Sequence, residues 1–309
     1  MTSTALAWLI RRHGIEMTHL SGGSHIASIL SVADIIGVLY SDILKFDINN
    51  PKWDGRDRFI LSKGHAGGAV YAALAESGFF DVSELKTHYQ NGSRLSGHVS
   101  HHLEGVDFST GSLGHGLSAA VGMAISAKMD KKSHRVFAVL GDGECNEGSV
   151  WEAAQVSSHY KLNNVTAIID NNKMQSLDYC ENTLNSGNLR DKWASFGWNA
   201  IVVDGHNHDE LRNALLKIHS SKPTAIIAET TKGKGIPFME MDILWHYRFP
   251  HDGWEYEYAV NALHQSKPEG VVDIYTPDGI ELTEKPEFDS SVKHIMSETY
   301  KPTWFDTEG

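Results

Sequence analysis

The sequence predicts an α/β fold, with a doubly wound, mostly parallel sheet and helices on both of its faces. Between residues 135 and 229, short apolar runs of strand length alternate with stretches of helical spacing, a pattern typical of a parallel sheet. Many of the helical stretches are rich in Ala, Gly and Ser, which allow close packing on a sheet. The 309 residues, of which 41% are hydrophobic and 21% charged, can bury a large core.

The expected elements follow in a regular order along the chain. Apolar helical spacing predicts helices over 4–19 and 31–44, the second with Ser31 as its N-cap. Residues 63–78 read as a helix of small residues, and a glycine-rich turn leads into another helix over 111–129. The later elements are strands 135–140, 165–170, 198–203 and 224–229, alternating with helices 149–160, 188–196 and 208–219.

The alternating pattern is lost beyond about residue 235, and the chain therefore divides into two parts. Residues 1–250 are expected to form the α/β domain and 251–309 a C-terminal arm. Its last forty or so residues look extended, with short strands at most. Because a disordered tail is normally poorer in Tyr, Trp and Ile, we expect the arm to pack against the domain or against a partner.

Composition excludes several classes of function. The net charge of −12 and the absence of a basic face argue against nucleic-acid binding. Two cysteines, Cys145 and Cys180, are too few for a disulfide framework and favour a reducing compartment. The six-residue apolar run before Arg11 is too short for a signal peptide or a membrane span, and no later segment is expected to be long enough. We therefore expect a cytoplasmic protein.

A cluster of acids follows the strand in the stretch VFAVLGDGECNEG, residues 136–148. Asp142 stands at the carboxyl end of this strand, and Asn171 or Asn172 stands at the end of the next one. Ligands of parallel α/β sheets bind at this edge, and oxygen donors of this kind suit Mg²⁺ when phosphate oxygens complete its shell. Each motif alone is more often a plain turn, but together they suggest Mg²⁺ bridging the sheet edge to a diphosphate.

The motifs, taken in order, resemble the transketolase family up to about residue 250. GDG followed by an asparagine turn 172 − 142 = 30 residues later resembles the thiamine diphosphate fingerprint. Three stretches resemble the histidine motifs of the family: SGGSHIASILSVADIIGVLY, RDRFILSKGHAGGAVYAAL and LSGHVS. Its glycine loop is resembled by STGSLGHGLSAAVGMA. The metal-site motifs of the family are resembled by GDGECNEGSVWEAA and DNNKMQSLD, and its last histidine motif by TTKGKGIPFMEMDILWH.

The resemblance implies a cofactor site of thiamine diphosphate and Mg²⁺, or another divalent cation such as Ca²⁺ or Mn²⁺. The metal would have three protein ligands: Asp142, the Asn172 side chain and the Met174 carbonyl. The resemblance thus selects Asn172 over Asn171 as the ligand. Gly143 would lie against the diphosphate. The implied cofactor-binding positions are His65, Gly111, Ser112, Leu113, Asp142, Gly143, Asn172 and His246.

The resemblance also implies catalytic roles for His25, His98, His246 and Glu147. His25 and His98 would handle protons on sugar hydroxyls, and His246 would face both cofactor and substrate. Glu147 would join a hydrogen-bond network at a subunit interface, although an acid at a helix N-terminus is equally expected there. His101 and His102 are expected to be surface residues and Glu144 a solvated one, with no role for Cys145. His115 replaces the usual Gln of the family.

The family places the glutamate that activates the cofactor on a second α/β domain, for which this chain leaves no room. We therefore expect the N-terminal subunit of a split transketolase, a transferase that moves a two-carbon ketol unit from a ketose to an aldose. Its partner would carry the pyrimidine-binding domain, in an α₂β₂ assembly. The segment after His246 departs from the family, so Tyr247, Arg248 and His251 could reshape the substrate mouth for a sulfosugar or a branched sugar phosphate.

Three other functions fit the sequence less well. A deoxyxylulose-phosphate synthase carries both halves on one chain, so length disfavours it. A non-catalytic scaffold with this fold would have no need of Asp142, Asn172, His65 and His246. A Mg²⁺-dependent phosphatase would need an acidic nucleophile that the histidine set does not offer.

Overall fold

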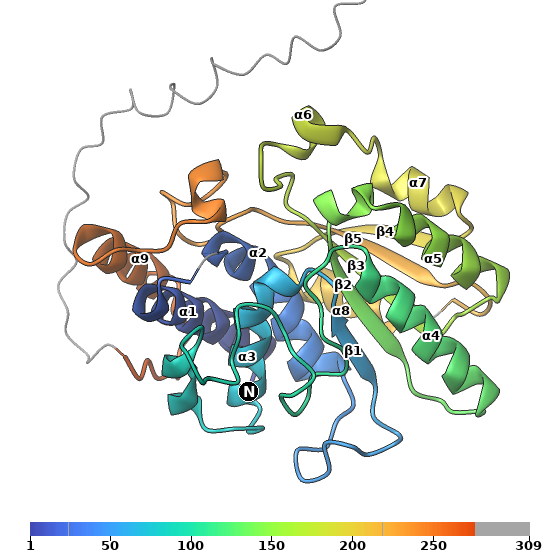
Figure 1. The fold of residues 1–309 in the computed structure, drawn as a ribbon, viewed down its shortest axis with the longest axis horizontal. Helices are drawn as coiled ribbons and strands as arrows, with labels where there is room; N and C mark the ends of the chain where they lie inside the picture. The colour runs from blue at the N-terminus through green and yellow to red at the C-terminus, as the bar shows by residue number, and fades with distance from the viewer. Residues whose placement is uncertain (24, 218, 276–309) are drawn as a thin grey trace, which may run out of the picture.

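The computed structural model describes residues 1–275 apart from 24 and 218, and it contains the expected parallel sheet (Figure 1). The strands of the described part are β1 (Arg58–Leu61), β2 (Val136–Gly141), β3 (Val165–Asn171), β4 (Asn199–Asp204) and β5 (Thr224–Glu229). All are parallel, in the order β1-β2-β3-β5-β4. The four predicted strands are therefore confirmed within a residue or two. β1 is an addition, because its four residues are too short an apolar run to stand out as a strand.

Helices cover both faces of the sheet. They are α1 (Ser3–Ser21), α2 (Ile26–Val38), α3 (Gly67–Glu76), α4 (His115–Met129), α5 (Gly148–His159), α6 (Cys180–Leu184), α7 (Leu189–Ser195), α8 (His208–Leu216) and α9 (Trp254–His264). Side chains alternate along β2: Phe137 and Val139 pack with α1, α2, α3 and α8, whereas Ala138 and Leu140 pack with α4, α5 and α7. This alternation places one apolar layer on each side of the sheet.

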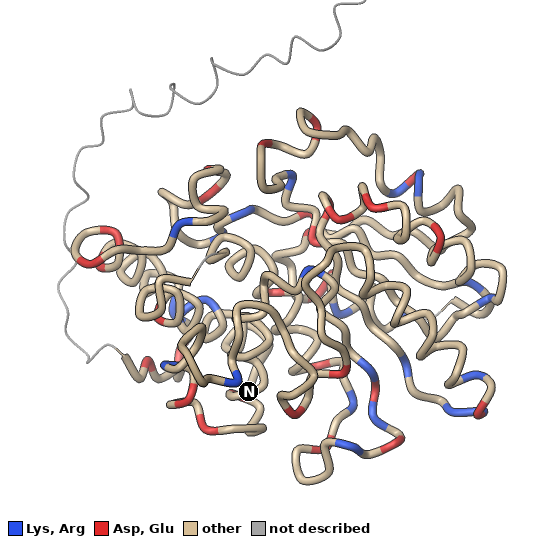
Figure 2. Tube along the Cα trace, in the orientation of Figure 1, with Lys and Arg blue, Asp and Glu red and all other residues tan. Residues whose placement is uncertain are grey.

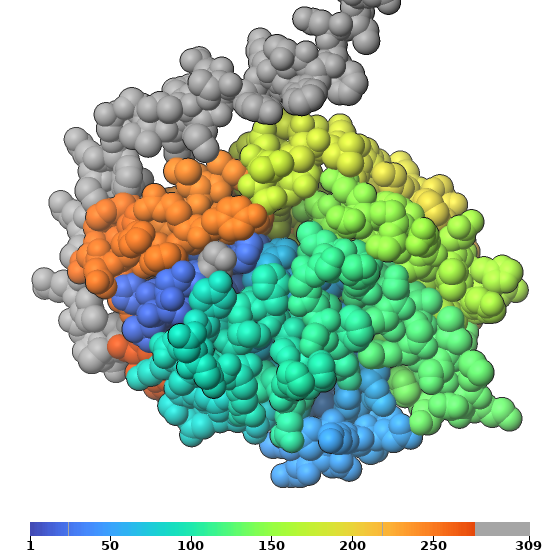
Figure 3. All heavy atoms as spheres, in the orientation of Figure 1, coloured from blue at the N-terminus to red at the C-terminus, as the bar shows by residue number. Residues whose placement is uncertain are grey.

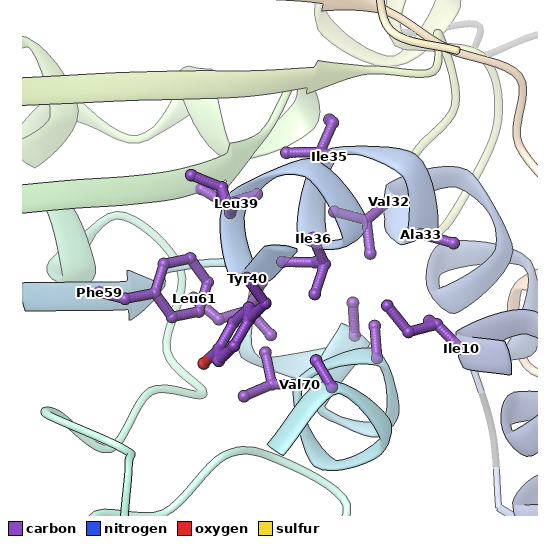
Figure 4. Packing of buried hydrophobic residues seen from close by; sticks show 14 of the residues in the cluster. Ile10, Val32, Ala33, Ile35, Ile36, Leu39, Tyr40, Phe59, Leu61 and Val70 are labelled. Atoms are coloured by element: carbon purple, nitrogen blue, oxygen red, sulfur yellow. The ribbon is translucent and has the colours of Figure 1, made fainter. Parts of the chain in front are cut away.

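The core under α2 shows how the first layer is built. Figure 4 shows side chains of α2 and the following π-helical turn, Leu39–Ile43, between β1 and α3. Tyr40 packs edge-on against Phe59, with ring centroids 5.6 Å apart. All residues of α2 are buried, and the stretch Ile26–Ile43 is long and apolar enough to cross a membrane. The expectation that no segment has that length is wrong. However, 89% of this stretch is buried inside the domain, as in the core helix of a soluble protein.

The start of α2 differs from the expectation. The helix begins at Ile26, with His25 as its N-cap residue, and not at Ser31. Ser31 is fully buried, and its hydroxyl donates to the Ser28 carbonyl at 3.1 Å and to the Asp170 carboxylate at 2.7 Å. Ser31 therefore does not cap a helix, and its side chain instead connects α2 to β3.

Helix α9 packs on the N-terminal helices. Its Val260 and Leu263 share a buried cluster with Trp8 and Leu9 of α1, and the space-filling view shows the orange C-terminal segment against the blue N-terminal one (Figure 3). The Arg12 guanidinium donates to Asp273 at 2.9 Å, and both side chains are 1% exposed. The arm is therefore packed on the domain as far as residue 275, and its predicted remainder, 276–309, lies outside the described residues.

Candidate active site

Two of the three predicted oxygen donors, the side chains of Asp142 and Asn172, lie at the carboxyl edge of the sheet. β2 and β3 are neighbours, with Gly141 opposite Asp170, so Asp142 and Asn172 follow directly from adjacent strand ends. Both side chains are buried, Asp142 to 5% and Asn172 to 2% exposure. One Asp142 oxygen accepts from the Gly143 amide at 2.8 Å, and the other accepts from the Lys173 amide at 2.5 Å. The Asn172 oxygen accepts from the Met174 amide at 3.2 Å.

These donors fit a hard cation. Carboxylate, amide and carbonyl oxygens are the ligands that Mg²⁺ takes, and each side-chain oxygen keeps a second lone pair beyond its backbone contact. Burial and the nearby Asp170 carboxylate raise the pKa of Asp142. Among the described residues, no group of three or more His, Cys, Asp or Glu side chains is placed to hold a metal ion. An oxygen site of the predicted kind does not require such a group.

The surroundings of Gly143 fit an anion. A Cβ atom at this position would lie 2.9 Å from the Cβ of Gln175, closer than real Cβ contacts, so only glycine leaves the backbone open here. The Gln175 side-chain nitrogen is buried and has no hydrogen-bond partner within the described part of the chain. A buried donor of this kind is costly unless a ligand meets it.

Two buried lysines, which sequence reasoning missed, lie behind this edge. The Lys63 ammonium pairs with the fully buried Asp170 carboxylate. Burial opposes ionisation of Asp170, but Lys63 and the hydroxyl donors around it hold its pKa below the ordinary value. The Lys232 ammonium donates to the Ser28 hydroxyl at 2.9 Å, and burial together with Lys63 lowers its pKa to about 8. Both lysines stand in family-like motifs, KGHAGG and TTKGKG, so the signal was available.

The four histidines singled out in the sequence come together next to the lysines. The His25 ring lies at the centre, with centroid distances of 5.0 Å to His65, 5.3 Å to His246 and 6.2 Å to His98. They come from the start of α2, the short helix Gly64–Ala66, the turn Ile243–His246 and a loop. We call these four side chains the site histidines.

The site histidines are held neutral. Burial and the nearby Lys232 ammonium lower the pKa of His25 to about 4 and that of His246 to about 2, and burial with Lys63 lowers that of His65 well below its ordinary value. The Nδ1 atoms of His25 and His246 are buried without a hydrogen-bond partner among the described residues. Neutral imidazoles with free nitrogens can exchange protons with a ligand.

The backbone of His25 is strained. Its φ of 72° and ψ of 22° lie in the left-handed region, which costs a non-glycine residue roughly 1–2 kcal/mol. Its side chain makes no capping hydrogen bond to α2. Strain of this kind clusters at functional sites, and here it directs the ring of His25 to the other three.

Among the remaining predicted residues, Gly111 lies next to the site histidines. Gly111 faces the His98 ring, 3.7 Å from the position of a Cβ, and leads with Ser112 and Leu113 into α4. Glu147 is exposed at the start of α5 and makes no capping hydrogen bond. The contacts of these residues with cofactor or partner stay predictions. The exposed positions of His101 and His102 agree with the sequence.

One sequence-based expectation about the acids is wrong, because Glu144 is buried and not solvated. It is 2% exposed, and its carboxylate accepts from the Ser62 hydroxyl and from the amides of Gly114 at 2.9 Å and Gly141 at 3.1 Å. These donors offset the cost of removing the charge from water. Glu144 therefore ties the glycine loop before α4 to the end of β2. Cys145 is a buried free thiol.

A second histidine-containing group, which the sequence did not reveal, lies under the loop after β5. Asp34 accepts two hydrogen bonds from Arg11, at 2.5 and 3.0 Å, and one each from His206 at 2.7 Å and His208 at 3.0 Å. His206 in turn accepts from the Thr231 amide at 2.9 Å, next to Lys232. We call Asp34, Arg11, His206 and His208 the Asp34 brace.

Comparison with known proteins identifies the family. Residues 2–246 match the family described as transketolase, thiamine diphosphate binding domain. The chain is 38% identical over 255 residues to an apulose-4-phosphate transketolase subunit of Phocaeicola vulgatus, covering 82% of this chain and 90% of the relative. The chain belongs to the transketolase family.

A second relative and a solved structure also match this chain. The chain is 40% identical over 241 residues to 6-deoxy-6-sulfo-D-fructose transketolase subunit SqwG of Clostridium sp., covering 77% of this chain and 88% of that subunit. The crystal structure of Campylobacter jejuni transketolase superposes with a TM-score of 0.79 at 30% identity, covering 85% of this chain but 42% of that one. The chain thus spans about two fifths of that transketolase chain. The predicted fold and the predicted N-terminal subunit of a split transketolase, a transferase, are confirmed.

Proposed function

We propose that this chain works with a second subunit to transfer a two-carbon ketol unit from a ketose to an aldose. The observation that carries the proposal is its match to two transketolase subunits over 90% and 88% of their lengths, with the site histidines gathered at the carboxyl edge of the sheet. The partner would supply the pyrimidine-binding domain and the activating glutamate. An α₂β₂ assembly is part of the proposal.

We further propose that Asp142, Asn172 and the Met174 carbonyl hold Mg²⁺, or another divalent cation, against the diphosphate of thiamine diphosphate. When bound, this cofactor supplies an electron sink for the transferred two-carbon unit. The open backbone at Gly143, the unpartnered Gln175 nitrogen and the positive charges of Lys63 and Lys232 would receive the diphosphate. His65 and His246 would donate hydrogen bonds to it.

The site histidines would handle the protons of the sugar hydroxyls. His25 is neutral and has a free Nδ1 atom, so it can accept a proton from a hydroxyl and return it. His98 stands at the outer, exposed side of the group and would bind the sugar further along its chain. A non-catalytic scaffold gains no support, because it would have no use for unsatisfied nitrogens and a strained His25.

The substrates proposed are modified sugars. The two relatives are named for apulose 4-phosphate and 6-deoxy-6-sulfo-D-fructose, and the segment after His246 departs from the usual family sequence. A cytoplasmic location remains part of the proposal. It is supported by the free thiols of Cys145 and Cys180.

Reconstitution with the second subunit tests this function. The purified chain alone should transfer no ketol unit, and addition of the partner, thiamine diphosphate and Mg²⁺ should produce transfer. Asp142→Ala should abolish Mg²⁺-dependent cofactor binding, measured by calorimetry, while Asp178→Ala, an exposed acid after the same turn, should not. Strong activity of the chain alone would contradict the split-subunit proposal, and unchanged cofactor affinity of the Asp142 variant would contradict the metal assignment.

A further inference from the structure

Tyr247, the residue directly after His246, lies over the site histidines. Its ring centroid is 5.2 Å from that of His25, in an edge-on arrangement, and 4.6 Å from that of His246. Nevertheless 57% of the side chain is exposed. An exposed aromatic ring beside the partly buried His25 and the buried His246 is open to contact with a substrate that binds at these two histidines.

The loop that carries Tyr247 is held firmly. The Glu255 carboxylate of α9 accepts from the Arg248 guanidinium at 2.6 Å and from the His251 amide at 3.0 Å. The Phe249 ring packs on Gly22, 3.4 Å from the position of a Cβ there, and the Pro250 carbonyl lies 2.9 Å from a His19 ring nitrogen. The backbone that carries Tyr247 is therefore held in place before any ligand arrives, which lowers the entropic cost of binding.

The same contacts remove the cationic side chain of this loop from the site. Arg248 is the only Lys or Arg between residues 247 and 253. Its guanidinium pairs with Glu255 and lies over the Trp245 ring, 5.0 Å from the centroid. What the loop offers next to His25 and His246 is an aromatic face and not a charge. Aromatic faces attract the weakly positive C–H edges of a sugar chain and supply contact area at little loss of side-chain freedom.

We propose, resting on the function proposed above, that Tyr247 is a specificity-determining residue. Its ring is a platform for the carbon chain of the ketose beyond the two carbons that are transferred. The ring contacts the C–H face of the sugar, and the hydroxyl group of Tyr247 is not required. A short substrate that ends near the site histidines does not reach it.

Steady-state kinetics of the reconstituted enzyme test this role. The donors are xylulose 5-phosphate, fructose 6-phosphate and 6-deoxy-6-sulfofructose, each with glycolaldehyde as a two-carbon acceptor. Tyr247→Ala should raise KM for the best of these donors about five- to tenfold, the range expected for loss of an aromatic contact. Its kcat and the KM for glycolaldehyde should stay within about twofold.

Two variants serve as controls. Tyr247→Phe keeps the ring and should bind the donor as the wild type does. Tyr160→Ala removes a tyrosine of similar exposure, 59%, from the end of α5 near the opposite edge of the sheet, and should change nothing. An unchanged donor KM in Tyr247→Ala, or an equal loss in Tyr247→Phe, would overturn the proposal. So would a fall in partner affinity that accounts for the loss, because the ring would then be an interface residue. A wild-type enzyme that turns over none of the donors would instead contradict the proposed function.

Discussion

The chain contains two groups of side chains with histidines, the Asp34 brace and the site histidines, and they differ in how their polar atoms are satisfied. In the Asp34 brace, both carboxylate oxygens accept two hydrogen bonds each, and only the Nε atom of Arg11 lacks a partner among the described residues. Among the site histidines, His25 and His246 keep unpartnered nitrogens, and His25 has a strained backbone. The folded chain thus satisfies both carboxylate oxygens of the Asp34 brace and leaves nitrogens of the site histidines open to a ligand.

This difference assigns a stabilising role to the Asp34 brace and a functional role to the site histidines. The brace joins α1 and α2 to the loops after β4 and β5, so it fixes the segment that carries Lys232. The site histidines add little hydrogen bonding to the fold and cost it strain. Lys and Arg are interspersed with Asp and Glu along the trace (Figure 2).

The largest effect is expected from Asp34→Ala. It leaves the buried Arg11 guanidinium without its partner, and breaking a buried pair in this way costs about 3–5 kcal/mol. The free energy of unfolding, measured with urea, should fall by that amount. Asp191→Ala, which removes an exposed pair with Arg190 at 3.0 Å, should cost less than about 1 kcal/mol. Equal losses of unfolding free energy in the two variants would show that the Asp34 brace stabilises the fold no more than an exposed ion pair does.

A smaller effect is expected from pH. The pKa of His246 is about 2 in the folded chain and about 6.5 when unfolded, so between pH 7 and 5 only the unfolded chain takes up a proton there. The free energy of unfolding should therefore fall as the pH is lowered, by about 2 kcal/mol at pH 5 from this residue. Asp34 contributes nothing in this range, because its pKa is depressed and its stabilisation is lost only below about pH 4.

His246→Gln should flatten this pH dependence, and the exposed His101→Gln should leave it unchanged. His25 and His88, whose pKa values are lowered to about 4 by burial, would maintain the rest of the slope. Denaturation midpoints at pH 7, 6 and 5 measure it. The same slope in His246→Gln and in the wild type would show that this histidine is not held neutral by the fold.

Much of the fold and of the site follows from local sequence, and the exceptions have physical causes. Strands β2 to β5 were predicted because their apolar runs are continuous, and Asp142 because a glycine-flanked acid ends one of them. The burial of Glu144 was missed because its donors, Ser62 and Gly114, are distant in sequence. The brace was missed for the same reason, since Asp34 and His206 meet only in the fold. Helix α9 was missed because its aromatic residues obscure the helical spacing.

His25→Gly tests most directly the claim that the unsatisfied, strained group is the active site. Glycine adopts the left-handed backbone freely, so the variant should be as stable as the wild type or more stable by about 1 kcal/mol. Lys161→Gly, which relieves a similar φ of 50° near the far edge of the sheet, serves as the control with full activity. In the enzyme reconstituted with its partner, His25→Gly should lower kcat/KM for ketol transfer about 100-fold. Ketol transfer at the wild-type rate, or a loss of activity that only follows unfolding, would contradict the account.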